Sequence, residues 1–134
     1  NISAGLANMS TKVVRGENTQ TGAQLYWSPR MSFTSWTTYS FGNGLTLGGG
    51  ARYQDSVSRR IDNTANAATT SMLRTRDFWV FDAFAAYQVN PNLRLQLNIY
   101  NLANKKYLAN LNNNGGRYTP GAARSVLLSA NMKF

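Results

Sequence analysis

The 134-residue sequence contains neither cysteine nor histidine. Their absence excludes disulfides, thiolate chemistry and most zinc or haem sites. The sequence also lacks any run of about 18 apolar residues, which excludes a membrane-spanning helix. A membrane-spanning β-strand is not excluded by this test, because such a strand needs only about 9–11 residues with alternate positions apolar.

Acidic residues are scarce: 5 Asp and Glu stand against 14 Lys and Arg, which gives a net charge of +9. A basic balance can indicate nucleic-acid binding. Here, however, the basic residues are scattered and adjoin at most in pairs, Arg59–Arg60 and Lys105–Lys106, with no basic helix. We therefore expect no nucleic acid partner. We expect instead that the basic side chains line a polar cavity or face anionic lipid headgroups.

Apolar and polar residues alternate along much of the chain, which predicts β-strands and an all-β fold. The segment 93–101 is the cleanest example, with four aliphatic residues at every second position and Arg94 and Gln96 between them. The alternation predicts six strands, at residues 2–13, 31–41, 45–58, 78–89, 93–101 and 123–134.

The connections between these strands alternate between short and long. The tripeptides GNG (42–44) and NPN (90–92) are tight turns, whereas the links 14–29, 59–74 and 104–122 are long. Short turns at one end and long loops at the other are typical of outer-membrane β-barrels. A soluble antiparallel sandwich also alternates its faces, but its strands have a usual length of about 5–6 residues. The long strands here favour the membrane barrel.

Aromatic residues fall where the two membrane interfaces are expected, because Trp and Tyr prefer that depth. Tyr39, Phe41, Tyr87 and Phe134 lie near the short turns, and Tyr53 and Trp79 lie toward the long loops. Six strands are too few to close, since a barrel needs about eight to house its own interior side chains. Two open edges in hydrocarbon cost several kcal/mol per unpaired backbone group. Residues 1–134 are therefore expected to be part of a larger barrel.

Four stretches resemble one protein family. The penultimate strand runs into NLANKKY (101–107), and GGRYTPGAAR (115–124) precedes the last strand. Upstream, SPRMSFTSWTTYSF (28–41) leads into GLTLGGGARY (44–53). Together they resemble the C-terminal end of TonB-dependent outer-membrane siderophore receptors. The sequence departs from the family pattern at Ala103, usually aromatic, and at Ala123, frequently Pro.

The resemblance implies an antiparallel transmembrane barrel of 22 strands in the bacterial outer membrane, plugged by an N-terminal domain. Residues 1–134 would be its last six strands, or three hairpins, and the plug and TonB box would lie elsewhere. The implied function is energised import of a ferric siderophore, with no enzyme activity, cofactor or resident metal. Basic loops favour a catecholate chelate. The alternatives are a passive porin or structural outer-membrane barrel without ligand specificity, and a soluble β-rich binding module.

The resemblance also implies partners and residue roles. The partners are outer-membrane lipid and LPS, the TonB–ExbB–ExbD system acting through the plug, the missing strands, and the barrel assembly machinery. Basic and aromatic loop residues suit an anionic chelate through charge-assisted hydrogen bonds and cation–π contacts. The ligand-binding candidates are Arg59, Arg60, Arg74, Arg76, Lys105, Lys106, Tyr107, Arg117 and Tyr118. Lumen residues expected to face plug carboxylates are Arg52, Arg94 and Arg124. The expected assembly signal comprises Val126, Leu128, Met132 and Phe134.

Overall fold

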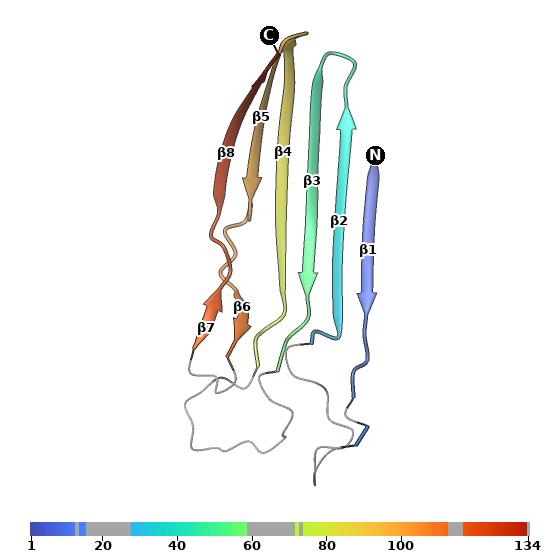
Figure 1. Ribbon diagram of the computed structural model, residues 1–134, viewed down its shortest axis with the longest axis vertical. Helices are drawn as coiled ribbons and strands as arrows, with labels where there is room; N and C mark the ends of the chain where they lie inside the picture. The colour runs from blue at the N-terminus through green and yellow to red at the C-terminus, as the bar shows by residue number, and fades with distance from the viewer. Residues whose placement is uncertain (13, 16–27, 59–71, 73, 113–116, 134) are drawn as a thin grey trace.

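The computed structural model describes residues 1–12, 14, 15, 28–58, 72, 74–112 and 117–133. The strands are β1 (Ile2–Asn8), β2 (Met31–Ser40), β3 (Leu45–Gln54), β4 (Phe78–Asn90), β5 (Leu93–Tyr100), β6 (Leu108–Leu111), β7 (Tyr118–Pro120) and β8 (Ser125–Met132). Six of them form one antiparallel sheet in the order β1-β2-β3-β4-β5-β8, and β6 pairs with β7 in a separate hairpin (Figure 1). No helix in the described part of the chain is long and apolar enough to cross a membrane.

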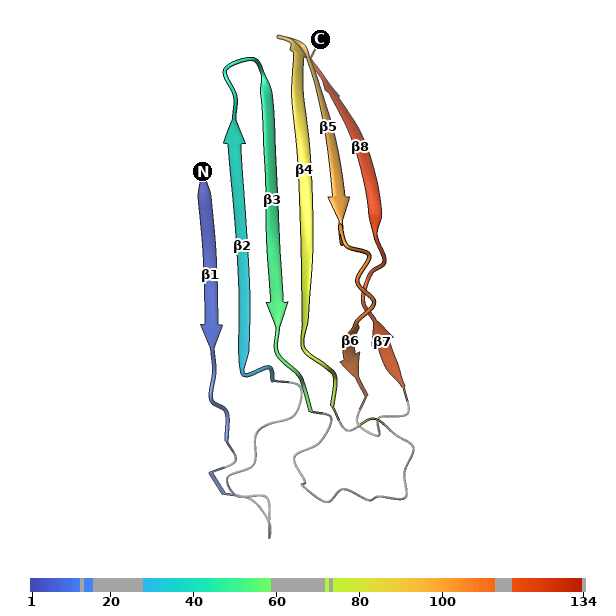
Figure 2. The ribbon, with the colours of Figure 1, turned by 180° about the vertical axis from the view of Figure 1, so that it is seen from behind.

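The two ends of the sheet differ. The β2–β3 and β4–β5 turns lie at one end, where β1 begins and β8 ends, and the opposite ends of these strands, together with β6 and β7, lie at the other (Figures 1 and 2). We call these the short-turn end and the long-loop end. The β2–β3 turn is tight because Gly44 adopts a positive φ of 84° and Asn43 Oδ1 accepts the Leu45 amide at 3.2 Å. Glycine enters this region without the steric penalty of a Cβ.

The strand register divides the sheet into two faces, because residues directly opposite each other on neighbouring strands share a face. Arg52, for example, lies opposite Thr34 on one side and Val80 on the other. The polar face includes Thr34, Thr38, Thr46, Arg52, Asp82, Gln88, Arg94, Gln96, Asn98, Ser129 and Asn131. The apolar face includes Leu45, Leu47, Tyr53, Trp79, Phe81, Leu93, Leu95, Leu97, Ile99, Val126, Leu128 and Met132. The predicted alternation is confirmed.

Aromatic rings cluster at both ends of the apolar face, as predicted. Near the long-loop end the Trp79 ring lies 4.9 Å from Tyr53 and 5.9 Å from Phe33, centroid to centroid. Near the short-turn end Tyr39 and Phe41 meet edge to face at 4.7 Å. On β4, Trp79 and Tyr87 are separated by about 26 Å at roughly 3.3 Å per residue. This separation is close to the apolar band of about 25 Å that surrounds an outer-membrane barrel.

The long-loop end differs from the prediction in two respects. First, β3 ends at Gln54 rather than at residue 58, β1 ends at Asn8 rather than at residue 13, and β8 begins at Ser125 rather than at residue 123. After β3, Asp55 Oδ1 accepts the Ser56 amide at 2.7 Å, and such local side-chain bonds compete with the strand ladder. Second, the predicted loop 104–122 contains the β6–β7 hairpin. Strands of four and three residues are too short to show a period-two pattern.

Candidate functional site: the polar face and the long-loop end

Two aromatic rings lie flat on the polar face near the middle of the sheet. Trp36 of β2 and Phe84 of β4 are stacked, with ring centroids 5.6 Å apart and an interplanar angle of 6°. Both rings cover β3, where a Cβ at Gly48 would collide with Phe84 and one at Gly50 would collide with Trp36. The glycines thus make room for a flat aromatic platform between the two neighbouring strands.

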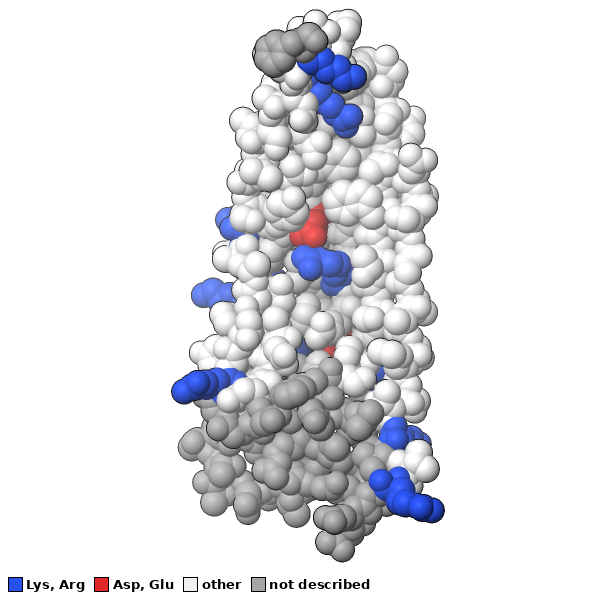
Figure 3. Space-filling model, viewed as in Figure 1, with Lys and Arg blue, Asp and Glu red and all other residues white. Residues whose placement is uncertain are grey.

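An ion pair lies beside this platform. Arg52 Nη2 is 3.2 Å from Asp82 Oδ2, and the arginine side chain is half exposed whereas the carboxylate is largely covered. The register places both residues on the polar face. Figure 3 shows an acidic group against a basic one about halfway along the sheet. Arg52 therefore already has an acidic partner within the sheet.

Asn101 is the centre of a hydrogen-bond network where β5 ends. It is buried, with 2% exposure, and adopts a positive φ of 52°. Its backbone N–H donates to Asp82 Oδ1 at 2.9 Å. Its side-chain Nδ2 donates to the carbonyls of Lys105 at 2.9 Å and Ala122 at 2.8 Å, while Oδ1 accepts the Lys105 amide at 2.8 Å. Asparagine is among the residues that tolerate a positive φ best.

Asn104 adds a second tie between the two ends of the same connection. It too has a positive φ, 50°, and its Oδ1 accepts the Arg124 amide at 3.2 Å. NLANKKY resembles a family motif, but the sequence alone assigns no structural role to Asp82 or Asn101. The signal was present in the two asparagines at turn-like positions after a clean strand, but their partners are about 20 residues away in sequence.

Tyr107 packs inside the long-loop end. Its ring centroid is 4.2 Å from that of Phe78, and a Cβ at Gly121 would collide with the tyrosine ring. The Gly121 amide also donates to the Tyr107 carbonyl at 2.8 Å. Lys105 and Lys106, the two residues before it, are exposed. Lys105 and Lys106 thus lie on the surface, whereas the Tyr107 ring packs against Phe78 and Gly121.

The β6–β7 hairpin carries the other two ligand candidates that lie close together. A cavity of about 400 Å³ is lined by Arg117, Tyr118 and residues 110–112 and 119. The hairpin is fixed by its backbone, since the Asn112 amide donates to the Arg117 carbonyl at 3.1 Å. Asn112 Oδ1 accepts the Arg117 amide at 3.0 Å. Arg117 and Tyr118 are exposed, and both of these hydrogen bonds involve the Arg117 backbone rather than its side chain.

The remaining loop candidates are more dispersed. Arg74 is exposed and donates from Nη2 to Ser56 Oγ at 2.8 Å, and Arg76 is exposed as well. Arg59 and Arg60 lie outside the described residues.

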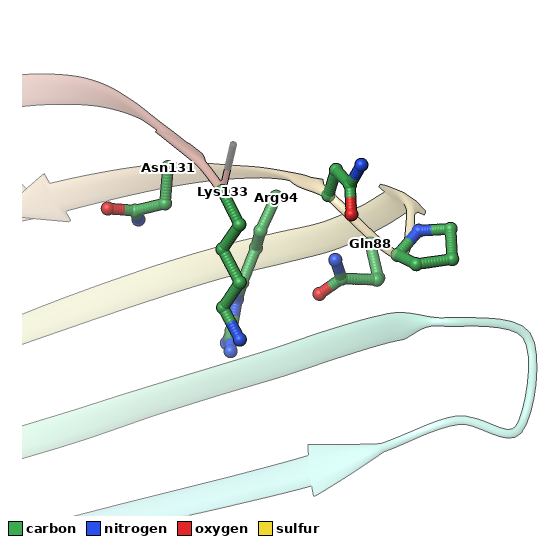
Figure 4. A pocket seen from close by; sticks show the side chains of 6 residues that line it. Gln88, Arg94, Asn131 and Lys133 are labelled. Carbon is green, nitrogen blue, oxygen red and sulfur yellow. The ribbon is translucent and has the colours of Figure 1, made fainter.

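Of the other two predicted lumen arginines, only Arg94 lies within the ladder. It sits on the polar face opposite Asn131 and lines a cavity of about 450 Å³ at the short-turn end (Figure 4). Arg124 is exposed and precedes β8, so the register assigns it to neither face. In the predicted assembly signal, Val126, Leu128 and Met132 share the apolar face of β8, and Phe134 lies outside the described residues.

The described residues contain no group of three or more His, Cys, Asp or Glu side chains that could hold a metal ion. The described residues instead form surfaces suited to binding a ligand. Exposed cations and Tyr118 lie at the long-loop end, and the polar face carries an ion pair along the sheet.

Comparison with known proteins identifies the barrel. Residues 1–102 match the family model described as TonB dependent receptor-like, beta-barrel. The chain is 39% identical over 112 residues to the catecholate siderophore receptor Fiu of Escherichia coli K12, covering 84% of this chain and 14% of Fiu. It is 33% identical over 146 aligned positions to the probable TonB-dependent siderophore receptor PiuA of Acinetobacter baumannii, covering all of this chain and 18% of PiuA.

The fold agrees with these relationships. The crystal structure of E. coli K12 Fiu in its closed form matches with a TM-score of 0.87 and 34% identity, over 99% of this chain and 18% of Fiu. The chain thus spans less than a fifth of the length of these relatives. The relatives are receptors rather than enzymes, and the predicted all-β antiparallel fold is confirmed. The chain belongs to the TonB-dependent receptor-like β-barrel family, whose members are outer-membrane β-barrels.

Proposed function

We propose that residues 1–134 are the last six strands of a 22-stranded TonB-dependent receptor that imports a ferric siderophore of the catecholate class. The observation that carries this proposal is the 39% identity to a catecholate siderophore receptor over 84% of the chain. No bond is made or broken in such import, and the siderophore is the cargo rather than a cofactor.

The charge distribution at the long-loop end supports an anionic cargo. Lys105, Lys106 and Arg117 are exposed there, together with Arg74 and Arg76. Charge-assisted hydrogen bonds from lysine and arginine to oxyanions are about twice as strong as neutral ones. The exposed Tyr118 ring adds a surface for cation–π or stacking contacts beside Arg117. Arg59 and Arg60 are also proposed as ligand-binding residues, on the basis of the sequence alone.

The two faces support the rest of the assembly. The apolar face would contact outer-membrane lipid, with LPS at the long-loop end. The apolar side of β8 would be read by the barrel assembly machinery, together with Phe134 on sequence grounds alone. The polar face would enclose an N-terminal plug on which TonB–ExbB–ExbD acts. Arg52 is already paired with Asp82, so Arg94 is the stronger candidate for a plug carboxylate, and Arg124 stays a candidate on sequence grounds.

The test is iron uptake by the complete receptor in a strain that lacks its own catecholate receptors. We expect uptake of a ferric catecholate, little uptake of a ferric hydroxamate, and loss of uptake when TonB is deleted. Equal uptake with and without TonB would support a passive porin instead. Uptake of the hydroxamate alone would retain the transporter and overturn the assignment of substrate class.

A further inference from the structure

The aromatic platform of Trp36 and Phe84 leaves an apolar surface open on the polar face. The two rings lie over β3 with an interplanar angle of 6°, and Trp36 is 37% exposed. The residues directly opposite them are small, because Ser3 lies opposite Trp36 on β1 and Gly48 lies opposite Phe84 on β3. Within the described part of the chain, the side of the platform that faces away from β3 is therefore open.

An open aromatic surface is unfavourable at this place in the sheet. Thr34 and Thr38 flank Trp36 on the same face of β2, and Asn98 lies opposite Phe84 on β5, so the surroundings are polar. Apolar area left in water costs free energy in proportion to its size, and an apolar patch with a polar rim is typical of a binding site. Packing on the glycines uses only one side of each ring.

Arg52 provides hydrogen-bond donors beside the platform. It follows Gly50, the glycine beneath Trp36, by two positions on the same face of β3. Its half-exposed side chain contacts Asp82 Oδ2 through Nη2, and the other oxygen of Asp82 accepts the Asn101 amide. The remaining N–H groups of the guanidinium can therefore donate to a further acceptor. Figure 3 shows this basic group on the open surface of the polar face.

Asn98 provides donors on the β5 side of the platform. Its Oδ1 already accepts Gln96 Nε2 at 3.0 Å. With this acceptor engaged, the Nδ2 group of Asn98 is left to donate. The platform thus combines an apolar floor with donors from Arg52 and Asn98. This combination is complementary to a flat ring that carries negatively charged oxygens.

We propose that Trp36 and Phe84 form a binding site for a planar aromatic anion, and that its ligand is a catechol ring of the siderophore in transit through the barrel. The inference rests on the proposed function, which supplies this cargo. The catechol ring would stack on the platform, while Arg52 and Asn98 donate to its oxygens. In the ferric complex these oxygens hold the iron and carry the negative charge, and the face of the ring stays free to stack.

The platform is a second site, separate from the ligand candidates at the long-loop end. Phe84 lies six positions after Phe78 on β4, or about 20 Å at roughly 3.3 Å per residue. Phe78 is the residue that contacts Tyr107 at the long-loop end. A ligand held at Arg117 and Tyr118 must therefore move along the sheet to reach the platform. Loss of the platform should impair passage and leave the first binding step unchanged.

Photoaffinity labelling of the intact receptor in iron-starved cells tests this site. The probe is the ferric complex of an azide-substituted dihydroxybenzoate, which bonds on illumination to whatever lies against its ring. In cells that contain TonB, we expect label on β2 and β4 beside the platform, located by mass spectrometry. Phe84→Leu should lower the label on β2 several-fold, whereas Phe81→Leu, a matched change on the opposite face of β4, should not. Both variants should bind the probe equally well in de-energised cells.

Two results would overturn the inference. One is label confined to the long-loop end or to the N-terminal domain while cells with the parent receptor import the probe. The other is label on β2 that stays equally strong in Phe84→Leu and Phe81→Leu. Uptake of an unmodified ferric catecholate, measured in the same cells, separates this inference from the proposed function. TonB-dependent uptake without label at the platform rejects the platform site alone, whereas absence of TonB-dependent uptake rejects the proposed function.

Discussion

The carboxylate of Asp82 accepts the backbone N–H of Asn101 at 2.9 Å, although the two residues are 19 positions apart in sequence. The other carboxylate oxygen faces Arg52 at 3.2 Å. The Asp82 side chain on β4 thus connects two neighbours of this strand. It contacts β3 on one side and the turn that follows β5 on the other.

Substitutions of Asp82 separate these two contacts. Asp82→Ala leaves the buried Asn101 amide without its acceptor, which costs about 1–3 kcal/mol of unfolding free energy. Asp82→Asn keeps an oxygen acceptor and loses only the pair with the half-exposed Arg52, a loss of about 0–1 kcal/mol. Urea unfolding of the intact receptor, followed by electrophoretic mobility, measures both. Equal losses for the two variants would show that the amide contact contributes nothing.

Asn101 is expected to be the least replaceable residue of NLANKKY. Asn101→Ala removes three side-chain hydrogen bonds and places at a positive φ a residue that tolerates this region less well than asparagine does. The buried groups left without partners cost about 1–3 kcal/mol, and the poorer tolerance of alanine for the left-handed conformation adds to this loss. Asn101→Gly relieves the backbone strain and should lose less. If alanine and glycine destabilise the receptor equally, strain plays no part.

The three consecutive glycines of β3 should respond differently to alanine. A Cβ at Gly50 would also lie 2.7 Å from the Ser35 carbonyl oxygen, and one at Gly48 2.9 Å from that of Thr37. At Gly49 the only atom of the described residues within reach is the Asp82 carbonyl oxygen, at 3.3 Å. Overpacking of this kind costs about 1–3 kcal/mol, so Gly48→Ala and Gly50→Ala should lower the unfolding midpoint more than Gly49→Ala.

Trp36 fluorescence provides an independent readout of the same glycines. Gly50→Ala must displace the indole ring that covers the glycine, so its emission should shift relative to the parent receptor. A Trp36→Phe variant supplies the background from the other tryptophans. An unchanged emission spectrum in Gly50→Ala would mean that the ring does not rest on the glycine.

Arg117 should contribute directly to ligand affinity if the β6–β7 cavity faces the siderophore. Arg117→Gln should weaken binding of a ferric catecholate by about tenfold, which corresponds to roughly 1.4 kcal/mol. Arg117→Lys keeps the charge without the planar fork and should recover part of the affinity. The hairpin should persist in both variants, because Asn112 binds the Arg117 backbone rather than its side chain. Unchanged affinity in Arg117→Gln would remove this residue from the ligand site.

The sequence predicted the sheet well because alternation is a local signal. In the segment 93–101, the order of apolar and polar residues alone is enough to assign the two faces of β5. The alternation also predicts the glycine-rich β3 as a strand, although glycine is unfavourable in strands and the strand ends four residues earlier than predicted. The sequence could not show that Trp36 and Phe84 cover β3. The Asp82–Asn101 contact and the short β6–β7 pairing depend on residues brought together only by the fold, so no local pattern indicates them.

The ties at Asn101 and Asn104 have an evolutionary consequence. Asn101 holds the Ala122 carbonyl and Asn104 holds the Arg124 amide, so both ends of the intervening segment are fixed to each other. Once its ends are fixed, doubling the length of a flexible segment adds only about 0.6 kcal/mol of closure entropy. Insertions, deletions and exchanges between residues 108 and 120 can therefore accumulate without shifting the register of β8. The β6–β7 segment is thus free to vary in length and sequence while the six-stranded sheet keeps its pairing.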